Sequence, residues 1–354
     1  MVLVALVALA ACSGGAGTMN SSVPVGSQSL QAATQTTAQA QTRITLGKPA
    51  PKSDDKIVYD SIPSPLAPIP SQGFECCSVS EFGDGVNLKG TGTLDTVSVV
   101  MDSWGCETGN GGVSAPDPNA CHTTPNSTFN VPITMNVYAI CPAATCVPAN
   151  SRVGALLATQ TKTFAIPYRP SADARCTGGR FYSDVATIGE SPPPGNCTHG
   201  LVNLIVFDAL VPQAGAPKNL PSQAIFTVAF NTTTWGYTPT GMPCNNNAPL
   251  FVISDSCGYD SLNVGAEGPG GPVGSAFDPN GAFINYRDAG FYCDPTAGSN
   301  YLRLDTGVNC WGPQASYPNG LHPQIQVRVS NKKDNDDKTK GNDNGDKNKH
   351  TDKE

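Results

Sequence analysis

Five carboxylates are candidates for the acid and base groups of a hydrolase: Glu81, Asp84, Glu107, Asp255 and Asp260. Hydrolysis of a glycosidic bond requires two carboxyl groups roughly 5 to 10 Å apart across a cleft. The sequences around these five are typical of turns and caps, where a carboxylate usually accepts backbone N–H bonds. The sequence therefore predicts no catalytic pair, and a secreted polysaccharide hydrolase is the least favoured function.

Nucleophilic catalysis finds equally little support. Three of the four histidines, His122, His199 and His322, lie beside Cys, Gly or Pro in segments typical of loops, and His350 lies in the charged C-terminal tail. A Ser/His/Asp triad could use His199 or His322 as its base, but no nucleophile segment of the G-x-S-x-G kind is present. Zinc-protease, Walker and dinucleotide motifs are absent as well. We therefore predict no catalytic residues.

The aromatic residues suggest binding instead. In Trp235-Gly-Tyr237, two rings share one side of the chain if the segment is extended. Such rings can stack on the apolar faces of sugars, while a nearby amide such as Asn231 binds hydroxyl groups. Trp235, Tyr237 and Asn231 are thus a candidate ligand-binding platform. The alternative is that Trp104, Trp235 and Trp311 fill or cover the core.

Oxygen-rich loops raise the question of a metal. Asn245–Asn247, Asp255, Asp260 and the Asp278-Pro-Asn-Gly281 turn offer ligands that calcium prefers, but none forms the spaced array of an EF-hand. Turns without metal are the favoured interpretation. We expect no metal site and no cofactor, and a structural calcium ion stays open as the alternative.

The cysteines indicate disulfides. There are 13 cysteines, and setting Cys12 aside leaves 13 − 1 = 12, an even number that suits six disulfides in an oxidising compartment. They do not form the paired C-x2-C array of a zinc site. Short loops close most readily, which predicts pairs between sequence neighbours. These are Cys106 with Cys121, Cys141 with Cys146, Cys176 with Cys197, Cys244 with Cys257, and Cys293 with Cys310, leaving Cys76 and Cys77 as a vicinal pair or two separate thiols.

Residues 1–11 are wholly apolar and have the length of a signal-peptide core, too short to span a bilayer. The following Leu9-Ala10-Ala11-Cys12 resembles a bacterial lipobox. That resemblance implies cleavage before Cys12 and lipidation of its thiol, hence a membrane partner held through acyl chains. No Lys or Arg precedes the apolar run, so the true start codon could lie upstream. A cleaved secretory peptide without lipidation is the alternative.

Composition excludes several protein classes. The chain carries 21 Lys and Arg against 28 Asp and Glu, a net charge of −7, and is only 39% hydrophobic with 37 Gly and 31 Pro. A multi-span membrane protein, a coiled coil and a basic nucleic-acid binder are therefore excluded. The balance is typical of an exported β protein.

Short runs of alternating apolar residues predict strands. Each run places its apolar side chains on one face, as a half-buried antiparallel strand does. Clusters rich in Gly and Pro separate the runs, and no repeat of propeller type is visible. We therefore predict an all-β, two-sheet antiparallel β-sandwich, jelly-roll-like and stapled by disulfides. The inward sets are Val97, Val99, Met101; Ile133, Met135, Val137; Val202, Leu204, Val206; Phe226, Val228, Phe230; and Ile325, Val327, Val329.

The ends of the chain differ from its middle. Residues 12–56 are rich in Gln, Ala, Thr and Ser and predict a lipidated, disordered stalk. Residues 331–354 alternate charge with Asn and Gly and predict a disordered tail. The sandwich is expected over 57–330.

A set of segments resembles exported bacterial β-sandwich proteins that have no assigned activity. The segments are Tyr59–Pro65, Ser80–Asp84, Met101–Trp104, Thr163–Pro170 and Tyr259–Val264. The resemblance spans roughly residues 57–330 and implies a sandwich fold and a surface location. It implies no mechanism and no disulfide positions.

Three functions remain. The favoured one is an extracytoplasmic protein, lipid-anchored to the bacterial membrane or cell surface, whose non-catalytic sandwich binds a glycan or envelope component and no nucleic acid. The alternatives are a structural envelope lipoprotein without a ligand site and the polysaccharide hydrolase. The sequence leaves the ligand and the oligomeric state open.

Overall fold

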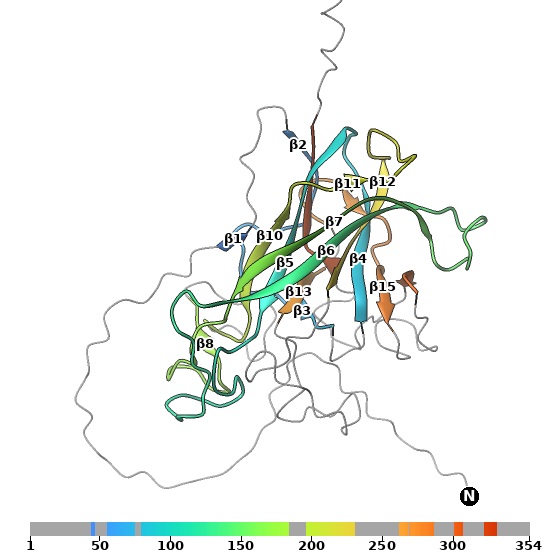
Figure 1. The fold of residues 1–354 in the computed structure, drawn as a ribbon. Helices are drawn as coiled ribbons and strands as arrows, with labels where there is room; N and C mark the ends of the chain where they lie inside the picture. Colours follow the sequence, from blue (N-terminus) through green and yellow to red (C-terminus); the bar gives the residue numbers. More distant parts are fainter. Residues whose placement is uncertain are drawn as a thin grey trace, which may run out of the picture.

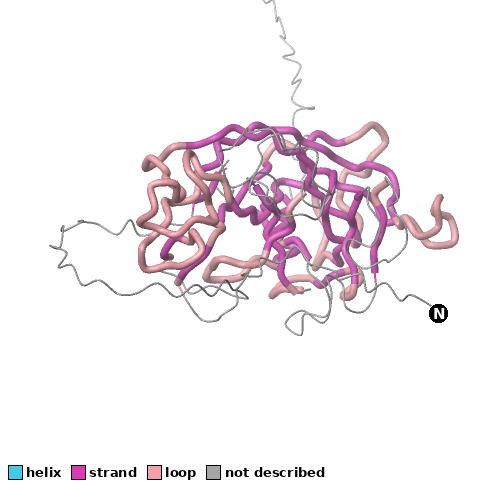
Figure 2. The backbone as a smooth tube through the Cα atoms, turned by 90° about the horizontal axis from the view of Figure 1, so that it is seen from below, coloured by secondary structure: helices cyan, strands magenta, loops and turns pink. Residues whose placement is uncertain are grey.

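In the computed structural model, the described residues are 44–46, 55–74, 79–183, 196–230, 262–268, 270–286, 301–306 and 322–330. Within these ranges the chain forms strands and loops and no helix, as Figure 2 shows. The predicted signal peptide and C-terminal tail lie outside the described residues. So do several single residues chosen from the sequence, namely Cys12, Cys76, Cys77, Cys244, Cys257, Cys293, Cys310, Asn231, Trp235 and Tyr237.

One large sheet, which we call sheet A, is built around β5 (Thr93–Ser103). β5 pairs antiparallel with β10 (Leu201–Phe207), β13 (Leu262–Glu267) and β18 (Ile325–Ser330). Four further strands extend the sheet at its edges. They are β1 (Ile44–Leu46), β2 (Asp55–Asp60), β3 (Ser71–Gln72) and β17 (His322–Pro323).

A second sheet, sheet B, contains the longest strands of the described part. Its core is the hairpin of β6 (Thr128–Ile140) and β7 (Val153–Pro167), flanked by β12 (Gln223–Phe230) and β4 (Val79–Asn87). β6 and β7 form the long green ribbon of Figure 1. The remaining strands of sheet B are β11 (Val211–Pro212), β14 (Ser275–Ala276), β15 (Gly281–Tyr286) and β16 (Arg303–Thr306).

The two sheets enclose one main hydrophobic core, to which both contribute. β5 buries Val97, Val99 and Met101, and β18 buries Ile325, Val327 and Val329, all at 0 to 1% exposure. From sheet B, β6 and β12 bury their predicted inward sets, with Phe230 only partly covered. Burying one such side chain stabilises the fold by roughly 1.5 to 3 kcal/mol. The predicted all-β, two-sheet antiparallel sandwich is confirmed.

β10 departs from the prediction. Leu204 and Val206 are buried on the outer face of sheet A, in a satellite cluster with Val100, against which Val202 packs. It is the alternate residues, Ile205 and Phe207, that enter the main core. Both faces of β10 are therefore covered, and alternation could not reveal which face meets the other sheet.

Chain connections repeatedly cross between the sheets. β4 lies in sheet B, β5 in sheet A, β6 and β7 in sheet B, β10 in sheet A and β12 in sheet B. Such switching is typical of jelly-roll-like sandwiches. The connections gather at opposite sides of the molecule: the β6–β7 loop on one side, and on the other the loops around β8 (Phe181–Tyr182) and β9 (Cys197–Thr198) (Figure 1).

The N-terminal edge of the sandwich differs from the predicted boundary. The sequence predicts a stalk through residue 56, but β1 already pairs parallel with β10 at Ile44–Leu46 and β2 begins at Asp55. Leu46 also packs against the main core. The sandwich thus recruits part of the predicted stalk as an edge strand, because pairing with β10 satisfies backbone groups that an open edge would leave free.

Candidate functional site

The outer face of sheet B carries a polar network. Because β6 points Ile133, Met135 and Val137 into the core, the alternate Thr134, Asn136 and Tyr138 point outward. They lie next to outward residues of β12, β4 and β7. We name Glu81, Asn136, Tyr138, Thr159 and Thr227 together the Glu81 site.

Glu81 is the centre of this network. Its Oε1 accepts hydrogen bonds from Asn136 Nδ2 at 3.0 Å, from the Tyr138 hydroxyl at 3.0 Å, and from the Thr227 hydroxyl. No described residue donates a hydrogen bond to the other oxygen, Oε2, and this oxygen is not among the fully buried side-chain atoms without a partner. One oxygen is therefore held in place while the second remains free to accept from a ligand.

A second layer of hydrogen bonds holds the donors. The Thr159 hydroxyl donates to Asn136 Oδ1 at 2.7 Å, which orients the amide so that its nitrogen faces Glu81. One residue pair further along the same face, the hydroxyls of Thr134 and Thr161 lie 2.7 Å apart. The side chains of four adjacent strands are thus oriented before any ligand arrives.

Tyr138 joins the polar network to an apolar one. Its ring packs against a cluster built on Ile225, Phe283 and Leu304, while its hydroxyl bonds to Glu81. Burial raises the pKa of the Tyr138 hydroxyl above its usual value, and the negative charge of Glu81 raises it further. The phenol therefore stays protonated and keeps donating to the carboxylate.

Gly83 makes room for this arrangement. A Cβ at residue 83 would clash with the backbone oxygen of Phe226 and lie only 2.5 Å from Thr227 Cγ2, so a side chain there would push on β12 and on the threonine that donates to Glu81. Gly85, two residues on, leaves space for Phe283, whose Cε2 would be 2.7 Å from an added Cβ. Both glycines are required by close approach rather than by a turn.

The candidate carboxylates do not come together. Glu81 lies on the outer face of β4, whereas Asp84, three residues on, shares the inner face with Phe82 and Val86 and is 1% exposed. Glu107 belongs to a loop, where its Oε2 accepts from Thr124 N at 2.6 Å. The sequence assigned Glu81 and Asp84 to turn-like segments, and this is wrong because both lie within a nine-residue strand.

Asp84 instead pairs with His322, which the sequence placed in a loop-like context. His322 is in β17, and its Nδ1 lies 3.2 Å from Asp84 Oδ1, with both side chains 1% exposed. Burial raises the pKa of Asp84, and the attraction of His322 opposes that rise. The pair connects an edge strand of sheet A to a central strand of sheet B, and its burial separates it from any substrate in solvent.

Loops beyond the sandwich form a second structured region, which we name the disulfide lobe: residues 104–127, 168–183 and 196–200. Cys106–Cys121 and Cys176–Cys197 have Cα–Cα distances of 5.6 and 5.7 Å. A third disulfide, Cys141–Cys146, closes the β6–β7 loop on the other side of the molecule. These are the same three couples that sequence proximity predicts.

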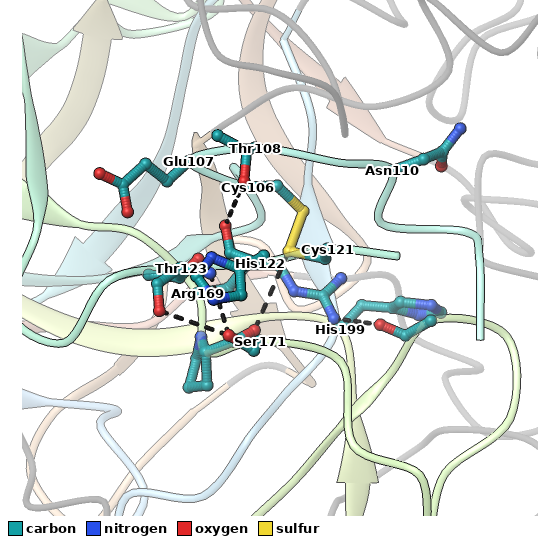
Figure 3. Close-up of a disulfide and its surroundings, with 12 residues drawn as sticks. Cys106, Glu107, Thr108, Asn110, Cys121, His122, Thr123, Arg169, Ser171 and His199 are labelled. Atoms are coloured by element: carbon teal, nitrogen blue, oxygen red, sulfur yellow. Dashed lines mark hydrogen bonds between the residues drawn. A yellow bond between two sulfur atoms is a disulfide. The ribbon is translucent and has the colours of Figure 1, made fainter. Parts of the chain in front are cut away.

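A buried cation lies inside the lobe. Arg169 is 0% exposed, its Nη2 donates to Gly179 O, and its guanidinium lies 5.5 Å over the Phe181 ring. Figure 3 shows this guanidinium next to His199, below the Cys106–Cys121 disulfide. The His199 ring stacks on Trp104 at 5.5 Å between centroids, and its Nε2 lies 2.7 Å from Gly178 O.

The lobe keeps His199 neutral. Burial lowers its pKa to about 3, and the positive charges of Arg169 and Arg180 contribute. A neutral ring donates through Nε2 to Gly178 O. Trp104 and His199 thus help to hold the loops of the lobe together.

In the described part of the chain, no three His, Cys, Asp or Glu side chains lie close enough together to bind one metal ion. The Asp278 turn uses its own oxygens: Oδ1 accepts from Asn280 N at 2.9 Å and Oδ2 from the Thr306 hydroxyl at 3.0 Å. The platform of Trp235, Tyr237 and Asn231 lies outside the described residues, as do Asp255 and Asp260.

Sequence reasoning missed the Glu81 site, although part of its signal was present. Once Ile133, Met135 and Val137 are assigned inward, Thr134, Asn136 and Tyr138 must face outward, and the same holds for Thr227 between Phe226 and Val228. No pattern linked these residues to Glu81, because they are 55, 57 and 146 positions away in the chain.

Comparisons with protein-family models, with curated proteins and with solved structures find no match to this chain. Within the described residues, no helix is long and apolar enough to cross a membrane. The disulfides indicate an oxidising environment outside the cytoplasm.

Proposed function

We propose that this chain is a lipid-anchored, extracytoplasmic protein of the bacterial envelope whose non-catalytic sandwich binds a glycan at the Glu81 site. The disulfides support the compartment, since such bonds persist where thiols are oxidised. The lipobox-like Leu9-Ala10-Ala11-Cys12 supports the anchor. The binding role takes its support from the outer face of sheet B.

The observation that carries the binding role is the preorganised carboxylate. Three donors hold Glu81 Oε1, and Oε2, next to a half-buried tyrosine, has no donor among the described residues. Sugars present hydroxyl donors together with apolar C–H faces, which a fixed carboxylate and an aromatic ring can bind together. Because the strands already hold these groups in place, ligand binding does not carry the entropic cost of ordering them.

Binding without hydrolysis is favoured by the separation of the carboxylates. Glycoside hydrolysis needs two carboxyl groups on opposite sides of one bond. Among the described residues, Asp84 is on the opposite face of β4 from Glu81, and Glu107 belongs to the disulfide lobe. Neither can act together with Glu81 on a ligand at the outer face.

The test of binding is a glycan array probed with the full chain purified in detergent. We expect binding to a restricted set of glycans and a loss of at least tenfold in affinity with Glu81→Gln, since a ligand hydrogen bond to a charged group contributes roughly 1.5 to 3 kcal/mol. The matched control is Asp208→Asn, which removes an acid that follows β10 and pairs with Lys162 of β7, on the side of that strand away from Glu81. Absence of binding to every glycan would support a structural envelope protein, and cleavage of a bound glycan would support a hydrolase.

The anchor has its own test. Cys12→Ala should release the chain from the membrane fraction of a host that processes lipoproteins, and mass spectrometry of the wild type should find acyl chains on Cys12. A wild-type chain that is soluble and unacylated in that host would disprove the anchor and leave the binding role untouched.

A further inference from the structure

We propose that the Glu81 site selects ligands rich in hydrogen-bond donors, and that its ligand is a glycan bearing free ammonium groups, an unacetylated amino sugar, rather than an anionic polymer. This inference rests on the proposed function, because it names the class of glycan for the same site. Its argument is the direction of each hydrogen bond in the network.

All the hydroxyl donors of the site, and one of the two N–H donors of Asn136, are used internally. An ionised carboxylate can only accept, so the hydroxyls of Tyr138 and Thr227 and one N–H of Asn136 must all donate to Glu81 Oε1. The Thr159 hydroxyl donates its only hydrogen to Asn136 Oδ1. The hydroxyl groups of Tyr138, Thr227 and Thr159 therefore have no hydrogen left to donate to a ligand.

What remains toward a ligand is mainly acceptor capacity. Glu81 Oε2 has no donor among the described residues and is not fully buried, and the oxygens of Tyr138 and Thr159 keep lone pairs after donating. A ligand that brings N–H or O–H groups can satisfy these acceptors. A ligand that brings carboxylate, phosphate or sulfate oxygens meets other acceptors and would be repelled.

The charges of the residues around the site also favour a ligand with donors over an anionic one. The outward positions of β6 over 130–138 and of β7 over 159–165 contain no Lys, Arg or His. Arg152, at the apolar end of this face, donates from Nε to Cys141 O at 2.9 Å and lies 5.0 Å over the Phe277 ring. Lys162 points to the opposite side of its strand and is bound to Asp208 at 3.1 Å.

An ammonium group is the donor that uses the site best. A hydrogen bond between N⁺–H and a carboxylate is roughly twice as strong as one between neutral groups. Partial burial of Glu81 reduces the screening that weakens exposed ion pairs. N-acetylation removes the charge and leaves one amide N–H, so it should weaken binding without abolishing it.

The test measures by calorimetry, at pH 6, where the amine of an amino sugar is protonated, how tightly the full chain binds each of three tetrasaccharides. The probes are a glucosamine tetramer, an N-acetylglucosamine tetramer and a galacturonate tetramer. We expect the glucosamine tetramer to bind roughly tenfold more tightly than its acetylated form, with no binding of galacturonate. The preference should shrink as salt rises from 0.05 to 0.5 M, because an ion pair is screened.

Two variants test whether the preference for the glucosamine tetramer comes from Glu81 or from the overall negative charge of the protein. Glu81→Gln should bring the affinities of the two glucosamine-based tetramers together, whereas Asp208→Asn should keep their ratio. Equal affinities for wild type, a preference that survives Glu81→Gln, or binding of galacturonate would overturn the inference while the proposed glycan binding stands. If no glycan of the array binds, the proposed function itself fails. If Glu81→Gln does not fold, the salt dependence of the wild-type affinity ratio between the two glucosamine-based tetramers is the test. A ratio that does not fall as salt rises would overturn the inference.

Discussion

The Glu81 site and the disulfide lobe hold their side chains by opposite means. On sheet B, the backbone ladders between β4, β12 and β6 place Glu81, Asn136 and Tyr138, and the side chains add only the final orientation. In the lobe, two disulfides and the buried Arg169 connect loops that have little regular structure. A sheet tolerates loss of one side chain without losing its shape, whereas a loop region depends on each of its connections.

Because of this difference, we expect the two regions to be damaged by different changes. Reduction and acid should act on the lobe, because its order depends on disulfides and on a neutral histidine. Changes within β4 should act on the sandwich and on the Glu81 site, because one strand serves both the core and the outer face.

The largest effect is expected from Asp84→Ala. The substitution leaves His322 buried without the carboxylate that lies 3.2 Å away, and removal of one partner of a buried pair costs about 3 to 5 kcal/mol. Chemical denaturation should show this loss as a lower midpoint. Asp208→Ala, which breaks an exposed pair with Lys162, is the control and should cost about 1 kcal/mol or less. Equal effects would mean that the Asp84–His322 pair does not connect the sheets.

Next in size is removal of the lobe disulfides. Cys106–Cys121 and Cys176–Cys197 close 15 and 21 residues, for which the chain-entropy model gives about 3 kcal/mol each. Replacing either pair with Ser should increase hydrogen exchange over 104–127 and 168–183, while amides of β6 and β12 stay protected. The matched control is Cys141–Cys146, which closes five residues and should matter least, at about 2 kcal/mol. Uniform loss of protection in both regions would show that lobe and sandwich unfold as one unit.

Gly83→Ala should damage the Glu81 site from within the sheet. The added Cβ would clash with the backbone oxygen of Phe226 and lie 2.5 Å from Thr227 Cγ2, and overpacking of this kind costs about 1 to 3 kcal/mol. Thermal denaturation and glycan affinity should both decrease. Gly268→Ala is the control, because an added Cβ there meets nothing within 4 Å. An unchanged affinity with Gly83→Ala would mean that the position of Thr227 is unimportant for binding.

The smallest effect concerns pH in the lobe. The pKa of His199 is lowered to about 3 in the folded chain from the ordinary histidine value of 6.5, so between these two pH values the unfolded state binds more protons. Stability therefore falls as pH drops below 6.5, by at most about 1.4 kcal/mol per pH unit. Hydrogen exchange of lobe amides, corrected for intrinsic rates, should rise from pH 6.5 to 5.5 while amides of β6 do not change. His199→Phe, which keeps a ring against Trp104, should remove this dependence, and its persistence would assign it to another group.

The strands of the sandwich could be predicted because alternation is a local property. A strand with one buried face shows its inward side in a few residues, as β5, β6, β12 and β18 do. The same reasoning failed for β10, whose two faces are both buried, and for the stalk boundary, where the short β1 pairs with a distant strand. The three described disulfides coincide with the predicted couples because their loops are short.

The sequence by itself determined the fold class, the inward residues of most strands and the nearest cysteine partners, because each depends on residues close together in the chain. Only the tertiary structure decided that Glu81 meets Asn136, Tyr138 and Thr227, and that Asp84 meets His322. These contacts depend on which strands become neighbours and in what register. Strand order and register follow from packing the whole core, in which segments distant in sequence compete for the same partners, and no local pattern specifies that outcome.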